Sequence, residues 1–276
     1  MKTKLTPFGY FGGKYFMADK LMPLFPSHKT YVEVFGGSGT ILINKKPSEI
    51  EVYNDIDGEP YNFFKVIADE KMFKKFQKKI SLLPYSRQLY YEYRDMRDKL
   101  DKAERAVRFY YLIKSTRHST CEYTGWKFSV EANMPKRVKN IEKLSLIHKR
   151  LSDVYIDNLD FRNLIANWDR PDTFFYLDPP YVASSRKSGG YMFEMTNEDH
   201  NDLINILLNV KGKWLLSGYD NNIYNDRLSG FYRQDFNCSA NSLRYRNKEN
   251  CPERTETVWA NYDLNEQGQN LSLFAV

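Results

Sequence analysis

The residues best suited to chemistry are Asp178-Pro179-Pro180-Tyr181, which directly follow the apolar run Thr173–Leu177. A run of β-branched, aromatic and aliphatic residues is typical of a strand that is buried on both faces. The two prolines remove two backbone donors and hold two φ angles, so they end this strand. An acidic side chain and an aromatic ring are thereby left at the carboxyl end of a strand, where ligands bind in open α/β sheets. A simple Asp-Pro turn is the common alternative, so the tetrapeptide alone leaves the function open.

A glycine-rich loop follows the first predicted strand, Thr30–Val34, and reads EVFGGSGT over residues 33–40. A strand, a glycine-rich turn and a helix start are what a nucleotide-cofactor loop requires. Gly36, Gly37 and Gly39 permit a tight turn and the close approach of a ligand to the backbone. The loop is neither a complete G-x-G-x-x-G fingerprint nor a P-loop, because no Gly-Lys-Ser/Thr ends it. Pyrophosphate binding is therefore not favoured.

A second predicted strand, Glu51–Tyr53, leads into Asn54-Asp55-Ile56-Asp57. An acidic residue at the tip of the second strand is placed to accept hydrogen bonds from a ribose diol. Asp55 or Asp57 could instead cap a helix that begins near Pro60. We favour ribose binding by Asp55, because the glycine loop precedes it at a suitable spacing.

Four stretches in this order resemble the Dam-like DNA adenine N6-methyltransferases. They are Phe8…Gly12-Gly13-Lys14, Glu33–Gly39, Asn54–Asp57 and Asp178–Tyr181, and they span most of the chain. In that family the glycine loop and the second-strand acid bind S-adenosylmethionine, and a target-recognition region precedes the DPPY motif. The resemblance also places Asp160 and Phe161 near the adenine of the cofactor, although Asp160 could instead cap a helix. The implied cofactor contacts are Tyr10, Gly12, Gly13, Lys14, Glu33, Phe35, Gly36, Gly37, Ser38, Gly39, Thr40, Asp55, Asp160, Phe161 and Asp178.

The chemistry that the resemblance implies is methyl transfer to the N6 amino group of an adenine flipped out of a specific DNA sequence. Asp178 and the carbonyl of Pro179 would accept the two N6 hydrogens, the rigid Pro179-Pro180 pair would aim that carbonyl, and Tyr181 would stack on the base. A sulfonium methyl is already activated, so neither a metal nor a covalent nucleophile is expected. The alternatives are methylation of RNA or another planar amine, and an inactive DNA-binding module.

Charge is divided sharply along the chain. Residues 71–150 contain 21 Lys and Arg against 8 Asp and Glu, a balance of +13, whereas the whole chain has a net charge of +6. Such a segment is typical of a module that faces phosphate, although solvated helix faces would give the same count. Three apolar stripes at helical spacing predict helices in this segment, at residues 72–83, 103–111 and 141–151.

The stretch Ser115–Arg137 has no helical period, and Thr124-Gly125 divides it into two short strand-like runs. It is predicted to form a hairpin or an ordered loop, and a polar loop without a role is the alternative. Half or more of the contacts to DNA usually touch only the backbone, so base and phosphate contacts are not separated here. The candidate DNA contacts, including two in the basic loop after the DPPY motif, are Arg117, His118, Asn133, Lys136, Arg137, Arg186 and Lys187.

These expectations define an α/β fold, with a Rossmann-like class I methyltransferase sheet and an inserted, mainly helical target-recognition domain. The catalytic, cofactor-binding domain would comprise residues 1–57 and 154–276, and the inserted domain residues 58–153 with its hairpin or loop near 115–137. Further strands are expected at Val154–Asn158, Lys213–Ser217, Phe231–Phe236 and Thr257–Tyr262. A helix is expected at Asn197–Val210, with His200 on its surface.

The expected setting is a bacterial or phage-encoded, cytoplasmic and nucleoid-associated enzyme. Its three cysteines lie far apart without metal-ligand spacing, and their odd number argues against a disulfide framework. No apolar run approaches the length of a membrane span, so no membrane partner is expected. Double-stranded DNA is the expected partner, with a possible cognate restriction endonuclease, and the chain is expected to be a monomer or a weak dimer.

Overall fold

The computed structural model describes residues 4–96, 99–117, 123, 125–182, 192–239 and 253–265. Its centre is a seven-stranded sheet with the order β3-β2-β1-β4-β5-β7-β6. The first five strands are parallel, whereas β7 runs antiparallel to both β5 and β6. The strands are β1 Thr30–Glu33, β2 Ile50–Asn54, β3 Val154–Asp157, β4 Thr173–Leu177, β5 Lys213–Tyr219, β6 Tyr232–Ser239 and β7 Glu253–Ala260.

This topology confirms the predicted mixed α/β class and puts a switch point at the middle of the sheet. The chain moves outward from β1 through β2 to β3, and then returns to place β4 on the other side of β1. Ligands of open α/β sheets bind in the crevice at the carboxyl ends of strands beside such a reversal. The glycine loop follows β1 and the DPPY motif follows β4. The two motifs therefore meet at this crevice.

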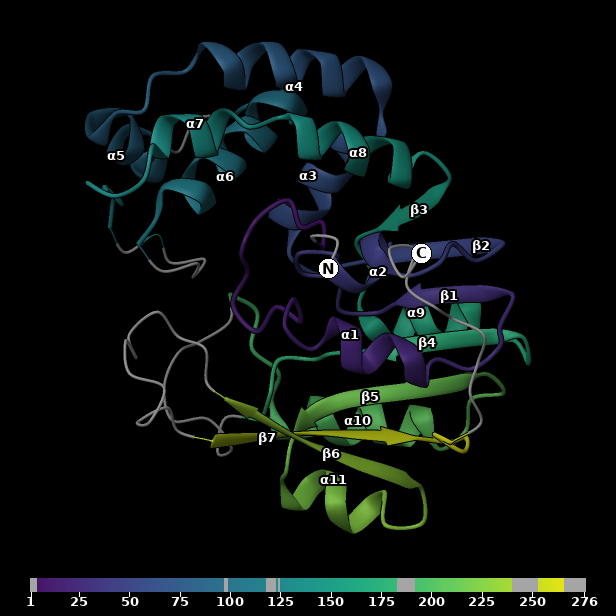
Figure 1. The fold of residues 1–276 in the computed structure, drawn as a ribbon. Helices are drawn as coiled ribbons and strands as arrows, with labels where there is room; N and C mark the ends of the chain where they lie inside the picture. The colour runs from purple at the N-terminus through teal and green to yellow at the C-terminus, as the bar shows by residue number, and fades with distance from the viewer. Residues whose placement is uncertain are drawn as a thin grey trace.

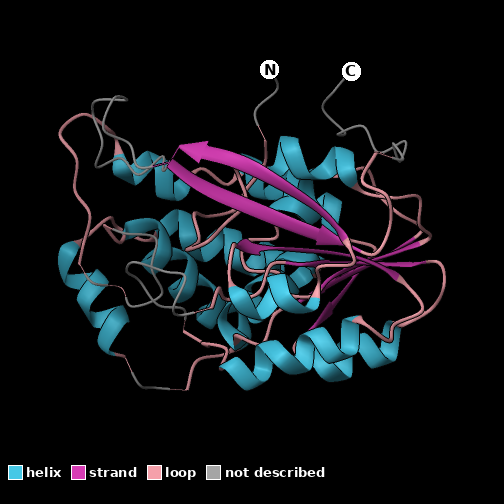
Figure 2. Cartoon of the chain, turned by 90° about the horizontal axis from the view of Figure 1, so that it is seen from below, coloured by secondary structure: helices cyan, strands magenta, loops and turns pink. Residues whose placement is uncertain are grey.

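The terminal strand pair extends further than its apolar residues predict. The predicted strands at 231–236 and 257–262 are instead Tyr232–Ser239 and Glu253–Ala260. Eight residue pairs, from Tyr232 with Ala260 to Ser239 with Glu253, join them, and Figure 2 shows this long antiparallel pair beside the shorter strands. Backbone pairing continues through polar sequence because the ladder bonds do not depend on apolar side chains.

Helices cover the sheet on both faces, and α4 to α8 form a layer beyond its β3 edge (Figure 1). This layer lies between β2 and β3 in the sequence. None of the described helices is long and apolar enough to cross a membrane. The helices are α1 Ala18–Leu21, the 3-10 helix η1 Met22–Leu24, α2 Thr40–Asn44, α3 Gly58–Ala68, α4 Glu70–Leu82, α5 Arg87–Asp95, α6 Lys102–Ser115, α7 Met134–Lys139, α8 Glu142–Leu151, α9 Phe161–Trp168, α10 Asn197–Leu207 and α11 Asn222–Arg227.

The three predicted stripes correspond to α4, α6 and α8, but the prediction for residues 115–137 is only partly right. Thr116 and Trp126 form an antiparallel bridge, as a hairpin or ordered loop requires. The last residues of the stretch instead begin the helix α7, because the Asn133 side chain accepts a hydrogen bond from the Lys136 N–H and caps it. Only two residues of α7, Met134 and Val138, are buried. That is too few to give a visible helical period.

Two apolar clusters lie on the two faces of the sheet. One face of β1 and β4 presents Tyr31 and Phe174 to a cluster that continues into α3–α8. The opposite face presents Val32 and Phe175 to α9 and α10. Because successive strand residues point to opposite faces, both faces bury side chains, as the continuous apolar runs predict. One cluster thus joins the sheet to the helical layer, and the proposed division into two domains stays a prediction.

The expectation that His200 is a surface residue is wrong. Its side chain is fully buried, and its Nδ1 lies 2.8 Å from the hydroxyl oxygen of Tyr224. His200 precedes Leu203, Ile204 and Leu207 at helical spacing on α10, and all of these residues are buried. The polar side chain therefore belongs to the inward stripe of an amphipathic helix, where a hydrogen bond compensates its burial.

Candidate active site

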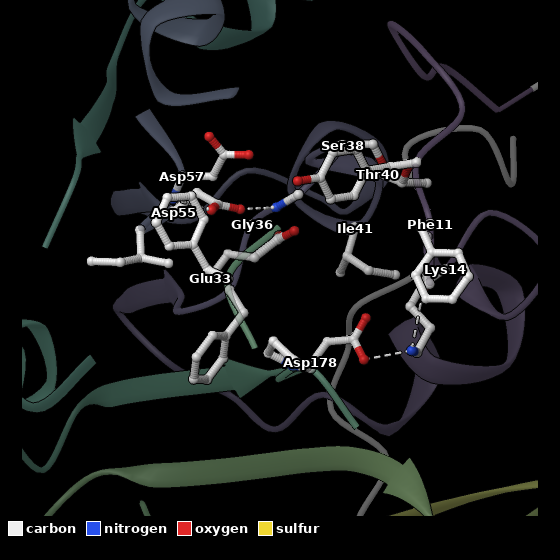
Figure 3. A pocket seen from close by; sticks show the side chains of 18 of the residues that line it. Phe11, Lys14, Glu33, Gly36, Ser38, Thr40, Ile41, Asp55, Asp57 and Asp178 are labelled. Carbon is white, nitrogen blue, oxygen red and sulfur yellow. Dashed lines mark hydrogen bonds and ion pairs between the residues drawn. The ribbon is translucent and has the colours of Figure 1, made fainter. Parts of the chain in front are cut away.

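The predicted motifs line one cleft of about 690 Å³ at the carboxyl ends of β1, β2 and β4. Figure 3 shows Asp55 and Glu33 on one side of it and Asp178 and Lys14 on the other. All predicted cofactor contacts except Gly39, Asp160 and Phe161 line this cleft. The lining residues are Tyr10, Phe11, Gly12, Gly13, Lys14, Glu33, Phe35, Gly36, Gly37, Ser38, Thr40, Ile41, Asp55, Ile56, Asp57, Tyr176, Asp178, Pro180, Met192 and Phe193.

The glycine loop needs glycine for two different reasons. A Cβ atom on Gly36 would overlap the ring of Tyr53, so the backbone passes too close to β2 for any side chain. Gly37 and Gly39 have φ angles of 50° and 61°, in the left-handed region that side chains disfavour. Gly39 lies at the N-cap of α2 rather than in the cleft wall. The turn thus brings the backbone of β1 directly into the helix while leaving the cleft open.

The structure gives the capping role that the sequence left open to Asp57, and ribose binding by Asp55 stays a prediction. Asp57 caps α3 by accepting a hydrogen bond from the Glu59 N–H at 2.9 Å. Asp55 instead accepts from the N–H groups of Gly37 and Asp57, at 2.7 and 2.8 Å. Burial raises the pKa of Asp55 to about 7, although these two hydrogen bonds oppose the rise. Asp55 is therefore held against the glycine loop with its carboxylate at the cleft.

Glu33 is a fully buried carboxyl group at the end of β1. It accepts hydrogen bonds from the Tyr31 hydroxyl and the Leu42 N–H, both at 2.8 Å. Burial is the main cause that raises its pKa to about 8. The bond to Leu42 ties the end of β1 to the first turn of α2, so Glu33 holds the loop between them in shape.

Asp178 lies at the carboxyl end of β4, as predicted. Its Oδ1 is 2.5 Å from Lys14 Nζ and accepts a hydrogen bond from the Ser217 hydroxyl at 3.1 Å. Burial raises the pKa of Asp178 to about 6, Lys14 opposes this rise, and the charge of Glu256 adds to it. At neutral pH the carboxyl group is thus mainly ionised and can accept hydrogen bonds.

Glu256 on β7 completes a cluster with Lys14 and Tyr181. Its Oε1 accepts a hydrogen bond from the Tyr181 hydroxyl at 2.5 Å and lies 3.2 Å from Lys14 Nζ. Lys14 also donates to the Tyr181 hydroxyl at 2.5 Å. The ring of Tyr181 contacts that of Tyr219 edge-on, at 4.5 Å between centroids. These contacts fix the orientation of the Tyr181 ring.

The sequence analysis missed Glu256 and Ser217. Ser217 was assigned to a strand without a role, and Glu256 falls one residue before the strand predicted at 257–262. In the sheet, Glu256 pairs with Tyr219 at the carboxyl end of β5. A polar residue at a buried strand position was the available signal, but only the pairing of β5 with β7 shows what it faces.

Asp160 and Phe161 line a second cavity of about 560 Å³, which shares Phe35 and Pro180 with the main cleft. Asp160 accepts a hydrogen bond from the Arg162 N–H at 2.9 Å and so caps α9. This is the competing role that the sequence left open. Contact of Asp160 and Phe161 with the cofactor stays a prediction.

The four predicted DNA contacts within the described residues do not line the cleft. Arg117 donates from Nε to the Trp126 carbonyl at 3.2 Å and thereby supports the bridge at residue 126. Asn133 caps α7, whereas the side chains of Lys136 and Arg137 are exposed on that helix. His118, Arg186 and Lys187 lie outside the described residues. Their roles stay predictions.

Comparison with known proteins assigns the family. The family of D12 class N6 adenine-specific DNA methyltransferases matches residues 10–238, which include the glycine loop, Asp55 and the DPPY motif. The chain belongs to this family. Membership confirms the resemblance drawn from the four motifs, and the enzyme class expected from the sequence is the class of this family.

The modification methylase StsI of Streptococcus sanguinis is a distant relative, 25% identical over 198 residues. The match covers 65% of this chain but 29% of that protein, so the chain spans less than a third of its length.

In the described part of the chain, no group of three or more His, Cys, Asp or Glu side chains could hold a metal ion.

Proposed function

We propose that this chain transfers a methyl group from S-adenosylmethionine to the N6 amino group of an adenine flipped out of a specific sequence in duplex DNA. The observation that carries the proposal is the convergence of Asp178 with the glycine loop and Asp55 on one cleft. The family provides independent support. The modification methylase name of the relative supports a role beside a cognate restriction endonuclease.

The residues of the cleft fit the proposed cofactor. The loop at Gly36 leaves no room for a side chain, and Asp55 presents a buried carboxylate beside it, as a ribose diol needs. Gly12, Gly13 and Phe35 would contact the rest of the cofactor. When bound, S-adenosylmethionine supplies a methyl group that its sulfonium centre has already activated.

Asp178 and the carbonyl of Pro179 would then hold the amine of the adenine. The lone pair of N6 is delocalised into the ring, so two acceptors are needed to draw the amine toward tetrahedral geometry and to stabilise its growing positive charge. In the structure, Lys14 Nζ donates a hydrogen bond to Oδ1 of Asp178. Where the amine of the base takes Oδ1, Lys14 Nζ would have to leave Asp178, and Glu256, 3.2 Å from the same nitrogen, can keep it paired.

Tyr181 would supply a stacking face for the extruded base. Unstacking a base requires a few kcal/mol, which contacts in the pocket and along the DNA backbone must offset. The hydroxyl of Tyr181 is held by both Lys14 and Glu256, so its ring is ordered before the base arrives. The cationic segment at residues 71–150 supports a further contribution from phosphate contacts.

The test is transfer of a tritiated methyl group to duplex DNA, with RNA of the same sequence as the comparison. We expect labelled N6-methyladenine in DNA, and Asp178→Ala should reduce turnover by at least about 100-fold while cofactor and DNA binding largely persist. Near-normal turnover of the variant would reject the role of Asp178. Labelling confined to RNA would reject DNA as the substrate, and no binding of the cofactor in calorimetry would reject the enzyme.

A further inference from the structure

A separate, basic cavity of about 520 Å³ lies between the N-terminal segment and helices α6, α7 and α8. The N-terminal segment contributes Thr6 and Pro7, and the helices contribute Lys114, Arg137 and Lys143. None of the residues that line this cavity is acidic. The structure therefore gathers three cationic side chains around one space without a neutralising carboxylate.

Lys114 is the unusual member of this group. It is partly buried on α6, and its nearest stabilising contact is the ring of Tyr110, at 5.7 Å from Nζ. Among the described residues its ammonium group has neither a hydrogen-bond partner nor an ion-pair partner. The two fully buried lysines among the described residues differ, since Lys14 contacts Asp178 and Lys45 contacts Glu51.

The surroundings of Lys114 are unfavourable for its charge. The pKa of Lys114 is lowered to about 8, mainly by burial and in addition by the nearby positive charges of Lys143, Arg137 and Lys127. The position of Lys114 in the last turn of α6 explains in part why a lysine is found there. A cation in the last turn interacts favourably with the free carbonyl groups at the end of the helix. That effect accounts for one cation on α6, but not for the convergence of three from three helices.

We propose that this cavity is a phosphate-binding site, and that the phosphate is one of the DNA backbone. Lysine supplies point charges and arginine a two-pronged donor, and together they suit the oxygens of a phosphate group. An anion would also neutralise the charges that now repel one another. The proposal rests on the proposed function for its DNA source, whereas the phosphate chemistry follows from the cavity itself.

The cavity lies beside the N-terminal segment that also lines the main cleft, so a phosphate contact there would help to position the DNA. Thr6 and Pro7 line it, and Tyr10 and Lys14, a few residues later in the same segment, line the main cleft. Thr6 also lies 3.3 Å from Thr40 between their hydroxyl oxygens, and Thr40 belongs to the cleft lining. Phosphate contacts set the register of a protein on a duplex. A phosphate held here would therefore place the DNA relative to the segment that carries Lys14 to Asp178.

The test compares Lys114→Gln with Lys114→Arg and with a control, Lys149→Gln, which removes an exposed lysine of α8 outside the cavity. The affinity for cognate duplex DNA is measured by anisotropy over a range of salt concentrations. Loss of one phosphate contact should reduce the slope of log K against log salt by about 0.9 and weaken binding about fivefold at 0.15 M salt. Lys114→Arg should retain the slope, and Lys149→Gln should match the unchanged chain.

Two results would overturn the proposal for DNA. One is a slope that Lys114→Gln leaves unchanged, and the other is an equal loss in Lys149→Gln. Thermal unfolding checks the fold, which Lys114→Gln should not weaken, because it removes an unpartnered buried charge. Inorganic phosphate, followed by phosphorus NMR, distinguishes the source. One outcome is that inorganic phosphate binds the unchanged chain but not Lys114→Gln, while both have the same salt slope of DNA binding. In that case the site binds free phosphate, and a DNA phosphate as its ligand is rejected.

The outcome is separable from that of the proposed function. If the chain transfers no methyl group but Lys114→Gln reduces the salt slope of DNA binding, the phosphate site is supported and the proposed enzyme activity is rejected. If every variant methylates DNA normally and all have the same salt slope, the enzyme activity is supported and the phosphate site is rejected.

Discussion

Replacing Glu256 with Gln should move the acid limb of the pH–rate profile to lower pH. This limb reports the ionisation of Asp178, whose pKa is about 6 because burial raises it, Lys14 opposes the rise and Glu256 adds to it. Glutamine keeps the size of the side chain and can still accept a hydrogen bond from Tyr181, but it has no charge. A neighbouring negative charge raises the pKa of a carboxyl group, so its removal lowers the pKa of Asp178.

The structure gives the scale of this shift in the pKa of Asp178. Lys14 Nζ lies 2.5 Å from Asp178 Oδ1 and 3.2 Å from Glu256 Oε1, so these two oxygens are at most about 5.7 Å apart. Coulomb's law at an effective dielectric constant of about 20 gives roughly 3 kcal/mol at that distance, or about 2 pH units. The ammonium group between the two carboxylates reduces the effect, and we expect a shift of about 1 pH unit.

The assay is kcat/KM for duplex DNA between pH 5 and 8, with tritiated S-adenosylmethionine at saturation. Under these conditions the limb reports the enzyme before DNA binds and is separated from ionisation in the cofactor site. Glu198→Gln, on the exposed start of α10, is the matched control and should leave the midpoint near pH 6. An acid limb that stays in place, or moves to higher pH, in Glu256→Gln would refute the electrostatic coupling of Glu256 to Asp178.

Two further predictions concern the cofactor loop. Gly36→Ala should destabilise the fold by about 1–3 kcal/mol and weaken cofactor binding, because the new methyl group overlaps the Tyr53 ring. Gly230→Ala, where nothing lies within 4 Å of the new atom, is the control, and equal melting temperatures of the two variants would contradict the close approach. Affinity for S-adenosylmethionine should rise as the pH increases through about 7. The pKa of Asp55 is about 7, so its carboxyl group ionises in this range and the carboxylate that would bind the ribose is then present. Asp55→Asn should bind more weakly and remove this rise, and a calorimetric titration that shows the same pH dependence in both proteins would exclude Asp55 as its origin.

Local patterns in the sequence were sufficient for the central sheet. The run Thr173–Leu177 is β4 to the residue, because an unbroken apolar stretch ended by two prolines has few other structures available. The cofactor motifs were equally visible, since the left-handed turns at Gly37 and Gly39 need glycine for their own backbone angles. The helix α7 was missed, because a side-chain cap and two buried residues form it without a periodic stripe.

Features that depend on packing between distant residues were not visible. Glu256 follows Lys14 by more than 200 residues, and only the pairing of β7 with β5 brings it to Tyr181 and Lys14. Lys114 sits at the end of an apolar stripe in α6, and nothing in its neighbours shows that α7 and α8 bring two more cations to it. Asp55 and Asp57 lie two residues apart in the sequence, but their hydrogen bonds differ. Asp55 accepts from the Gly37 N–H of the glycine loop, whereas Asp57 accepts from the Glu59 N–H of α3.

The helical layer is connected to the sheet at two adjoining points. The chain departs after Asn54 at the end of β2 and returns at Val154 in β3, and these strands are hydrogen-bonded neighbours. A different helical insert could therefore be exchanged between these two strands, downstream of Asp55, while the strand order of the sheet is preserved. Its incoming first helix would have to reproduce the contact of Phe64 with Tyr53, 4.3 Å between ring centroids, because that ring pair also shapes the floor beneath Gly36.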